Sequence, residues 1–160
     1  FLIEKINEKV GPHDTLWHLG DFGFGPNKIE RFVELRARIN CGTINLILGN
    51  HDDIFLDKKK NEKLLSIFNM VKLIHMGRVY GRYMVFCHYA MRTWPWQNDH
   101  SIQLYGHSHG NLAVDEGLLS LDVGVDTSWY GHEKFTPYSF DEIFSIMDKR
   151  KFLPIDHHGN

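Results

Sequence analysis

The sequence predicts an α/β fold, with a parallel βαβ half followed by an antiparallel half on one shared core. Helical and strand-like segments alternate over the first half of the chain, and several strand-like segments follow one another in the second. The 160 residues are 42% hydrophobic and 24% charged, which is typical of one ordinary globular domain. We therefore expect residues 1–160 to form a single domain.

The first elements are a helix over residues 1–10 and a short strand over residues 15–19. The helix is predicted because its apolar residues fall on one face, and Gly11-Pro12 ends it. The strand ends at Gly20-Asp21, and the glycine-rich loop 22–26 follows.

The next predicted elements are a helix from residue 27 to about residue 39 and a strand over residues 43–48. Asn27 is the expected N-cap, with Glu30 at the capping-box position. The strand is an apolar, β-rich run that ends at Gly49-Asn50.

The second half begins with a charged stretch at residues 57–61, expected to be a solvated loop, and a short helix over residues 62–68. Four strands follow, with a tight connection between the first two bracketed by Gly77 and Gly81. They span residues 71–75, 83–88, 102–105 and 118–123. A final helix begins after Ser139, with Glu142 at the capping-box position.

Composition excludes several classes of protein. The formal net charge of −2 argues against non-specific nucleic-acid binding, which needs a basic surplus. The longest apolar runs are too short to span a bilayer. The two cysteines, Cys41 and Cys87, form no CxxC pair, and we expect both to be reduced core thiols of a cytoplasmic protein.

Polar side chains gather where four of the predicted strands end. Ligands of open α/β sheets bind beyond the carboxyl ends of the strands, so these groups are candidates for one site. Carboxylate, amide and imidazole donors without a thiolate suit Mn, Fe or Zn. The imidazoles of His107 and His109 fall on the same side of an extended segment and can serve one metal ion or two neighbouring ones. The candidates are Asp21, Asn50, His51, Asp52, His88, His107 and His109.

In their order and spacing, four blocks resemble the calcineurin-like metallophosphoesterase superfamily, especially its small bacterial and phage members. The blocks are Gly20-Asp21, Gly49-Asn50-His51-Asp52, His88 and Gly106-His107-Ser108-His109, and together they extend over most of the chain. The resemblance implies an αββα sandwich with two divalent metal ions at one edge. It also implies hydrolysis of phosphate monoesters or diesters by a metal-activated hydroxide.

The resemblance also implies roles for single residues. Asp21 would bridge the two metals, Asn50, His88 and His107 would complete the second metal site, and His109 would belong to the first. His51 would donate a proton to the phosphoryl oxygen or to the leaving group. Asp52 would orient and charge-tune His51 through a carboxylate–imidazole contact.

One block of the family, Asp-x-His on the first strand, is absent from this sequence. The chain opens with Phe1 in a helix, so we expect a sheet that lacks its first strand and a chain cut from something longer. The first metal would then keep only Asp21 and His109. This leaves an alternative open, in which the chain is a metal-binding domain with impaired or no catalysis.

A weaker candidate lies in the connection after His88. Arg92 could clamp a phosphate, and Trp94 or Trp96 could stack on a base; alternatively, the tryptophans cover their own surface loop. The expected substrate is a phosphorylated small molecule or nucleotide, and nucleic acid enters only as a possible substrate. A nucleic-acid-binding module that uses the tryptophan-rich loop is a further alternative, disfavoured by the charge balance.

Overall fold

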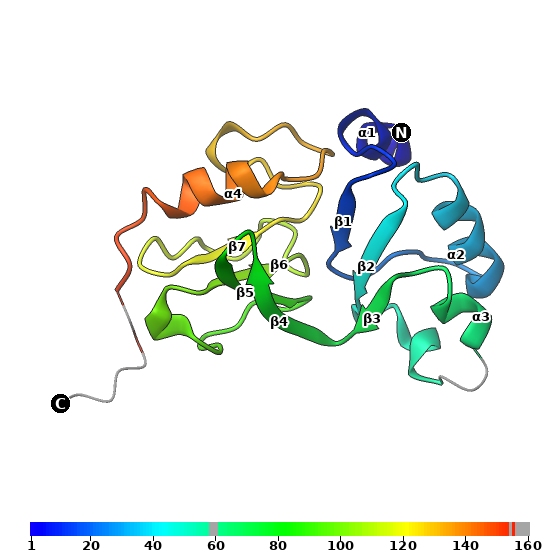
Figure 1. Cartoon of the computed structure of the whole chain (residues 1–160), viewed down its shortest axis with the longest axis horizontal. Coiled ribbons are helices and arrows are strands. Elements are labelled where there is room, and N and C mark those ends of the chain that lie inside the picture. Colours follow the sequence, from blue (N-terminus) through cyan, green and yellow to red (C-terminus); the bar gives the residue numbers. More distant parts are fainter. Residues whose placement is uncertain (58–60, 154, 156–160) are drawn as a thin grey trace.

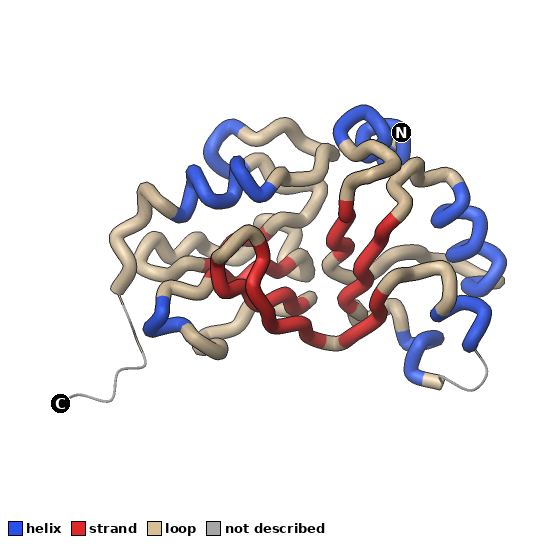
Figure 2. The backbone as a smooth tube through the Cα atoms, in the orientation of Figure 1, coloured by secondary structure: helices blue, strands red, loops and turns tan. Residues whose placement is uncertain are grey.

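Seven strands form two sheets in the described part of the computed structural model, which comprises residues 1–57, 61–153 and 155. Helices pack around the sheets, so the fold is mixed α/β (Figures 1 and 2). Positions 58–60 of the predicted charged loop lie outside the described residues.

The first sheet is parallel throughout and has the order β1-β2-β3. Its strands are β1 (Thr15–His18), β2 (Thr43–Ile47) and β3 (Met70–Lys72). Figure 1 shows α2 and α3 along the outer side of this sheet and α1 beyond the start of β1. These helices and the intervening 3-10 turn are α1 (Leu2–Lys9), α2 (Lys28–Ala37), η1 (Asp53–Leu56) and α3 (Glu62–Leu65). The predicted parallel βαβ half is confirmed.

The second sheet has the order β4-β5-β6-β7, and only its β4–β5 pair is antiparallel. The prediction of an antiparallel half is therefore wrong for the other two pairs. The connections 88–101 and 106–119 are long enough to return the chain to the same end of the sheet, which parallel pairing requires. The strands are β4 (Ile74–Val79), β5 (Arg82–Cys87), β6 (Ile102–Tyr105) and β7 (Ser120–Asp122).

The predicted strand 71–75 is two strands that belong to different sheets. The chain leaves the first sheet after Lys72 and enters the second at Ile74, with exposed Leu73 at the bend (Figure 1). The tight connection is at Tyr80-Gly81, and Gly77 lies within β4. Periodicity alone cannot report this break, because both strands continue the same extended run.

Buried apolar side chains form more than one cluster, and the predicted sharing of a core between the two halves holds for one of them. One cluster lies between the first sheet and helices α1 to α3. A second joins the opposite face of that sheet to the second sheet and helix α4 (Phe140–Met147). Its contacts include the stacked rings of Trp17 and Phe86, whose centroids are 4.1 Å apart.

The two predicted capping boxes have different outcomes. In α4 the Ser139 hydroxyl accepts from the Glu142 N–H, and the Glu142 carboxylate accepts from the Ser139 N–H, so this box is confirmed. In α2 the Asn27 side chain makes no capping hydrogen bond, because its backbone is left-handed with φ 54°. No helix among the described residues is long and apolar enough to cross a membrane.

Candidate functional site

Four of the candidate side chains meet around one atom, Nε2 of buried His88. Asn50 Oδ1 and His107 Nδ1 each lie 3.1 Å from this nitrogen, and Asp21 Oδ2 lies 3.5 Å from it. Each residue follows the carboxyl end of a different strand: β1, β2, β5 and β6. The strand ends of the two sheets therefore bring together residues that are as far apart in sequence as Asp21 and His107.

The hydrogen bonds of His88 define its tautomer. Nδ1 lies 2.6 Å from the carbonyl oxygen of Leu19, which can only accept, so Nδ1 carries the hydrogen. In the neutral ring Nε2 then presents a lone pair to the oxygens of Asn50 and Asp21. His107 can supply at most one proton to these three acceptors. The cluster thus concentrates lone pairs on a small space, an arrangement that favours a cation.

Glycine is required at two positions beside this cluster. Gly20 has φ 102°, and a side chain there would collide with the His88 ring and the Gly49 backbone. A side chain on Gly49 would collide with the Asp21 carboxylate. The two loops can therefore approach closely enough to bring Asp21 against His88.

Asp52 holds these loops together, and the prediction that it orients His51 is wrong. Its carboxylate is fully buried and accepts from the backbone N–H groups of Asp21 (2.7 Å), Gly49 (2.9 Å) and Phe22 (3.0 Å). Burial raises the pKa of Asp52, and these three hydrogen bonds oppose the rise. The sequence pattern suggested a carboxylate–imidazole pair, but the backbone donors take both oxygens.

His51 is exposed, and its backbone rather than its ring contacts the cluster. Its N–H donates to Asp21 Oδ1 (2.9 Å), and its carbonyl accepts from Lys28 Nζ (3.0 Å). The imidazole packs against Phe24, with ring centroids 5.0 Å apart. Phe24 was not predicted as a site residue, although its place in the loop after Asp21 was the available signal.

His109 does not join the cluster around His88. Its Nδ1 lies 2.6 Å from Asp126 Oδ2, and its ring is largely exposed. Asp122, at the end of β7, accepts from the N–H groups of Gly110 and Gly124 and so supports the backbone of this region. Asp126 as the partner of His109 was not predicted, since a contact across the loop 110–125 leaves no signal in local spacing.

Comparisons with known proteins give a fold but no family. The chain is similar to the crystal structure of AQ665, a protein of unknown function from Aquifex aeolicus, with a TM-score of 0.60. The match covers 91% of this chain and 82% of that chain at 18% sequence identity, which indicates a shared fold alone. No protein-family model and no curated protein matches the chain, so the resemblance to calcineurin-like enzymes rests on the motifs.

The candidates in the loop after His88 lie in different surroundings. Trp94 is only 6% exposed, and its indole N–H donates to the carbonyl and the hydroxyl of Ser101. The prediction that Trp94 stacks on a base is wrong, because the loop folds over its own indole. Arg92 is exposed, and its role in phosphate binding stays a prediction.

No group of three or more His, Cys, Asp or Glu side chains in the described residues has a geometry that could hold a metal ion. The contacts around His88 are direct ones between side chains, and one of the four donors is an amide. A metal site at this cluster therefore stays a hypothesis.

His18 is a further imidazole near the cluster. Its Nδ1 is buried and has no hydrogen-bond partner among the described residues. Burial lowers the pKa of His18 to about 4, although the charge of Asp21 opposes this shift. The ring is thus neutral at pH 7 and packs against Phe22.

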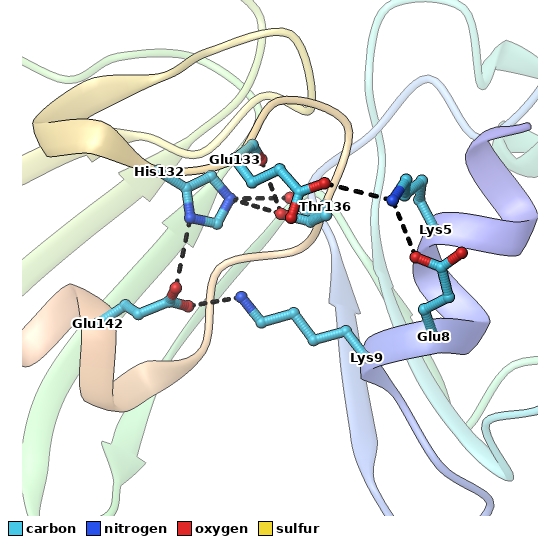
Figure 3. A pocket seen from close by; sticks show the side chains of 7 residues that line it. All are labelled: Lys5, Glu8, Lys9, His132, Glu133, Thr136 and Glu142. Atoms are coloured by element: carbon cyan, nitrogen blue, oxygen red, sulfur yellow. Dashed lines mark hydrogen bonds and ion pairs between the residues drawn. The ribbon is translucent and has the colours of Figure 1, made fainter.

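A cavity of about 280 Å³ lies elsewhere, between α1 and the segment 132–142 (Figure 3). It shares no residue with the cluster around His88. Figure 3 shows Lys5 paired with Glu133 and Lys9 paired with Glu142, so ion pairs from α1 cross it. We assign this cavity to the contact between α1 and the start of α4.

Proposed function

We propose that this protein is a metal-dependent phosphoesterase with the αββα sandwich of the calcineurin-like superfamily. The observation that carries the proposal is the concentration of lone pairs around His88 Nε2. Donors bound 2.0–2.2 Å from one ion at angles of 90–109° lie about 2.8–3.6 Å apart. The separations of 3.1, 3.1 and 3.5 Å from His88 Nε2 fall within this range.

The donor types support a divalent ion. Imidazole, amide and carboxylate groups suit Mn, Fe or Zn, and Asp21 supplies the only formal negative charge among the four donors. When bound, such an ion supplies Lewis-acid stabilisation of phosphoryl oxygens and lowers the pKa of a water molecule. Asp21, Asn50, His88 and His107 would hold it.

Other residues have separate roles in this proposal. His51 donates a proton to the leaving oxygen, and its exposed ring is free to reach a substrate. Asp52 keeps the two loops in register through backbone contacts, so its effect on the site is indirect. A second ion would use Asp21 and His109. His109 would bind it through Nε2, because Nδ1 contacts Asp126 and Nε2 has no hydrogen-bond partner in the described part of the chain.

A titration of the protein with Mn²⁺, combined with hydrolysis of p-nitrophenyl phosphate and bis-p-nitrophenyl phosphate, tests this function. His88→Ala should weaken Mn²⁺ binding by more than about a hundredfold. His51→Ala should retain Mn²⁺ and lose about 10²–10⁴-fold in kcat. His13→Ala, in an exposed turn, is the matched control. Unchanged Mn²⁺ affinity in His88→Ala would remove the basis of the proposal.

The pairing of His109 with Asp126 favours a second candidate, a metal-binding domain without turnover. In that case only the cluster around His88 binds metal. One equivalent of Mn²⁺ without hydrolysis of either substrate supports this candidate, whereas two equivalents with turnover reject it.

A further inference from the structure

A large apolar ring lies exposed beside the candidate site. Phe24 is 59% exposed, and its ring contacts the His51 imidazole. The two residues come from the loops that follow β1 and β2, which are parallel neighbours, so both lie at the same edge of the sheet.

The fold anchors the loop that carries Phe24 but does not use its ring. Phe22 is buried among other aromatic rings, and its N–H donates to Asp52. Gly23 packs so closely on Phe32 that a side chain there would be crowded. Phe24 belongs to none of the buried clusters of the described residues, and His51 is the only ring it contacts there. A loop anchored through Phe22 and Gly23 thus presents a solvent-exposed ring beside His51.

The place of Phe24 has a consequence for the leaving group. His51 protonates the leaving oxygen in the proposed function, so the leaving group occupies the His51 side of the site. Phe24 presents an exposed ring on that side, in contact with His51. An aromatic side chain binds a planar ring by stacking, and the free energy of stacking is similar for different bases.

We propose that the substrate is a small phosphate ester whose leaving group carries a planar ring, and that Phe24 determines this preference. The inference rests on the proposed function. Nucleoside monophosphates and aryl phosphates share this chemistry. The net charge of −2 favours a small ester over a nucleic-acid polymer.

Adenosine 5′-monophosphate and ribose 5-phosphate form a matched pair of substrates, because both release a primary alcohol and only the nucleotide carries a planar base. We expect kcat/KM for the nucleotide to be higher by about 5- to 150-fold. Phe24→Leu should reduce that ratio to near one and leave kcat/KM for ribose 5-phosphate within about twofold. Phenyl phosphate separates the two sources: a loss in Phe24→Leu restricted to the nucleotide identifies nucleosides, and a loss restricted to phenyl phosphate identifies aryl esters.

Two aromatic residues serve as controls. Tyr89 is 46% exposed, and its ring contacts those of His107 and His88 and not that of His51. Tyr80 is 81% exposed in the turn between β4 and β5, and the whole length of β5, about 20 Å, separates this turn from His88. Tyr89→Leu and Tyr80→Leu should keep the nucleotide preference. Equal loss in Tyr89→Leu would overturn the assignment to Phe24.

Binding separates failure of this inference from failure of the proposed function. If neither ester is hydrolysed, calorimetric titration with adenosine 5′-monophosphate still tests Phe24. Binding that weakens by about tenfold in Phe24→Leu supports the ring site without phosphoesterase activity. Absent binding, or turnover that is equal for both esters and unaffected by Phe24→Leu, overturns the inference; equal turnover leaves the phosphoesterase proposal intact.

Discussion

Replacement of Asp52 by Asn tests how the loops after β1 and β2 are held at the site. The buried carboxylate accepts three backbone N–H groups, two at Oδ2 and one at Oδ1. An Asn side chain can keep its oxygen toward Asp21 and Gly49. Its amide nitrogen then faces the Phe22 N–H, donor against donor, and that bond is lost.

The expected loss of stability follows from these three bonds. Hydrogen bonds to a charged acceptor contribute about 1.5–3 kcal/mol each, and neutral ones about 0.5–1.5 kcal/mol. Exchanging three charged bonds for two neutral ones costs about 4 kcal/mol. Relief of the buried charge, which already raises the pKa of Asp52, returns about 1–2 kcal/mol of this. We expect a net loss of about 2–3 kcal/mol, or a Tm lower by about 5–10 °C in a domain of this size.

Urea unfolding followed by circular dichroism measures this change, and Mn²⁺ titration of the folded variant reports on the site. Asp53→Asn is the matched control, because the neighbouring Asp53 is exposed and pairs with Lys28 at the surface. Its effect should stay below about 1 kcal/mol. An Asp52→Asn protein with an unchanged urea midpoint would refute the role of the carboxylate as the link between the loops.

Two further substitutions test regions outside the site. Trp94→Phe removes the two indole hydrogen bonds to Ser101 and part of a buried ring, so we expect a stability loss of about 2 kcal/mol in urea unfolding. Trp96→Phe is the control and should cost less, because the Trp96 side chain is 39% exposed. Equal losses of stability in the two variants would contradict the burial argument. Burial alone would raise the pKa of Glu142, but hydrogen bonds led by Lys9 lower it to about 2, so its contribution to stability is present above the unfolded pKa of 4.5 and lost as the pH falls toward 2. Glu142→Gln should therefore flatten the acid side of the stability curve, and an acid limb identical to that of the parent protein would disprove this coupling.

The ends of β1 and β2 were predictable from the sequence because each is marked locally. Gly20-Asp21 and Gly49-Asn50 stop apolar runs, and glycine before a polar residue signals a turn that exposes it. The N-cap of α4 was predictable for the same reason, since a capping box spans only four residues. By contrast, the strand pairing of β5 to β7 depends on where long connections return, which no local pattern encodes.

The candidate site divides in the same way. The residue types of the site could be predicted from the sequence, and four of the predicted residues meet around His88 Nε2. The roles of Asp52 and Trp94 could not be predicted. The Asp52 carboxylate accepts from backbone N–H groups and not from His51, and the Trp94 indole donates to Ser101 within its own loop. The pair His109–Asp126 and the exposed ring of Phe24 became visible only with the loops in place.

By itself the sequence determined which site residues follow the ends of strands, because turn chemistry and apolar periodicity act over a few neighbours. The tertiary structure decided which of those residues share a space and what each polar atom contacts. Hydrogen-bond partners and burial are set by segments distant in sequence, and these segments come into contact only when the two sheets pack together.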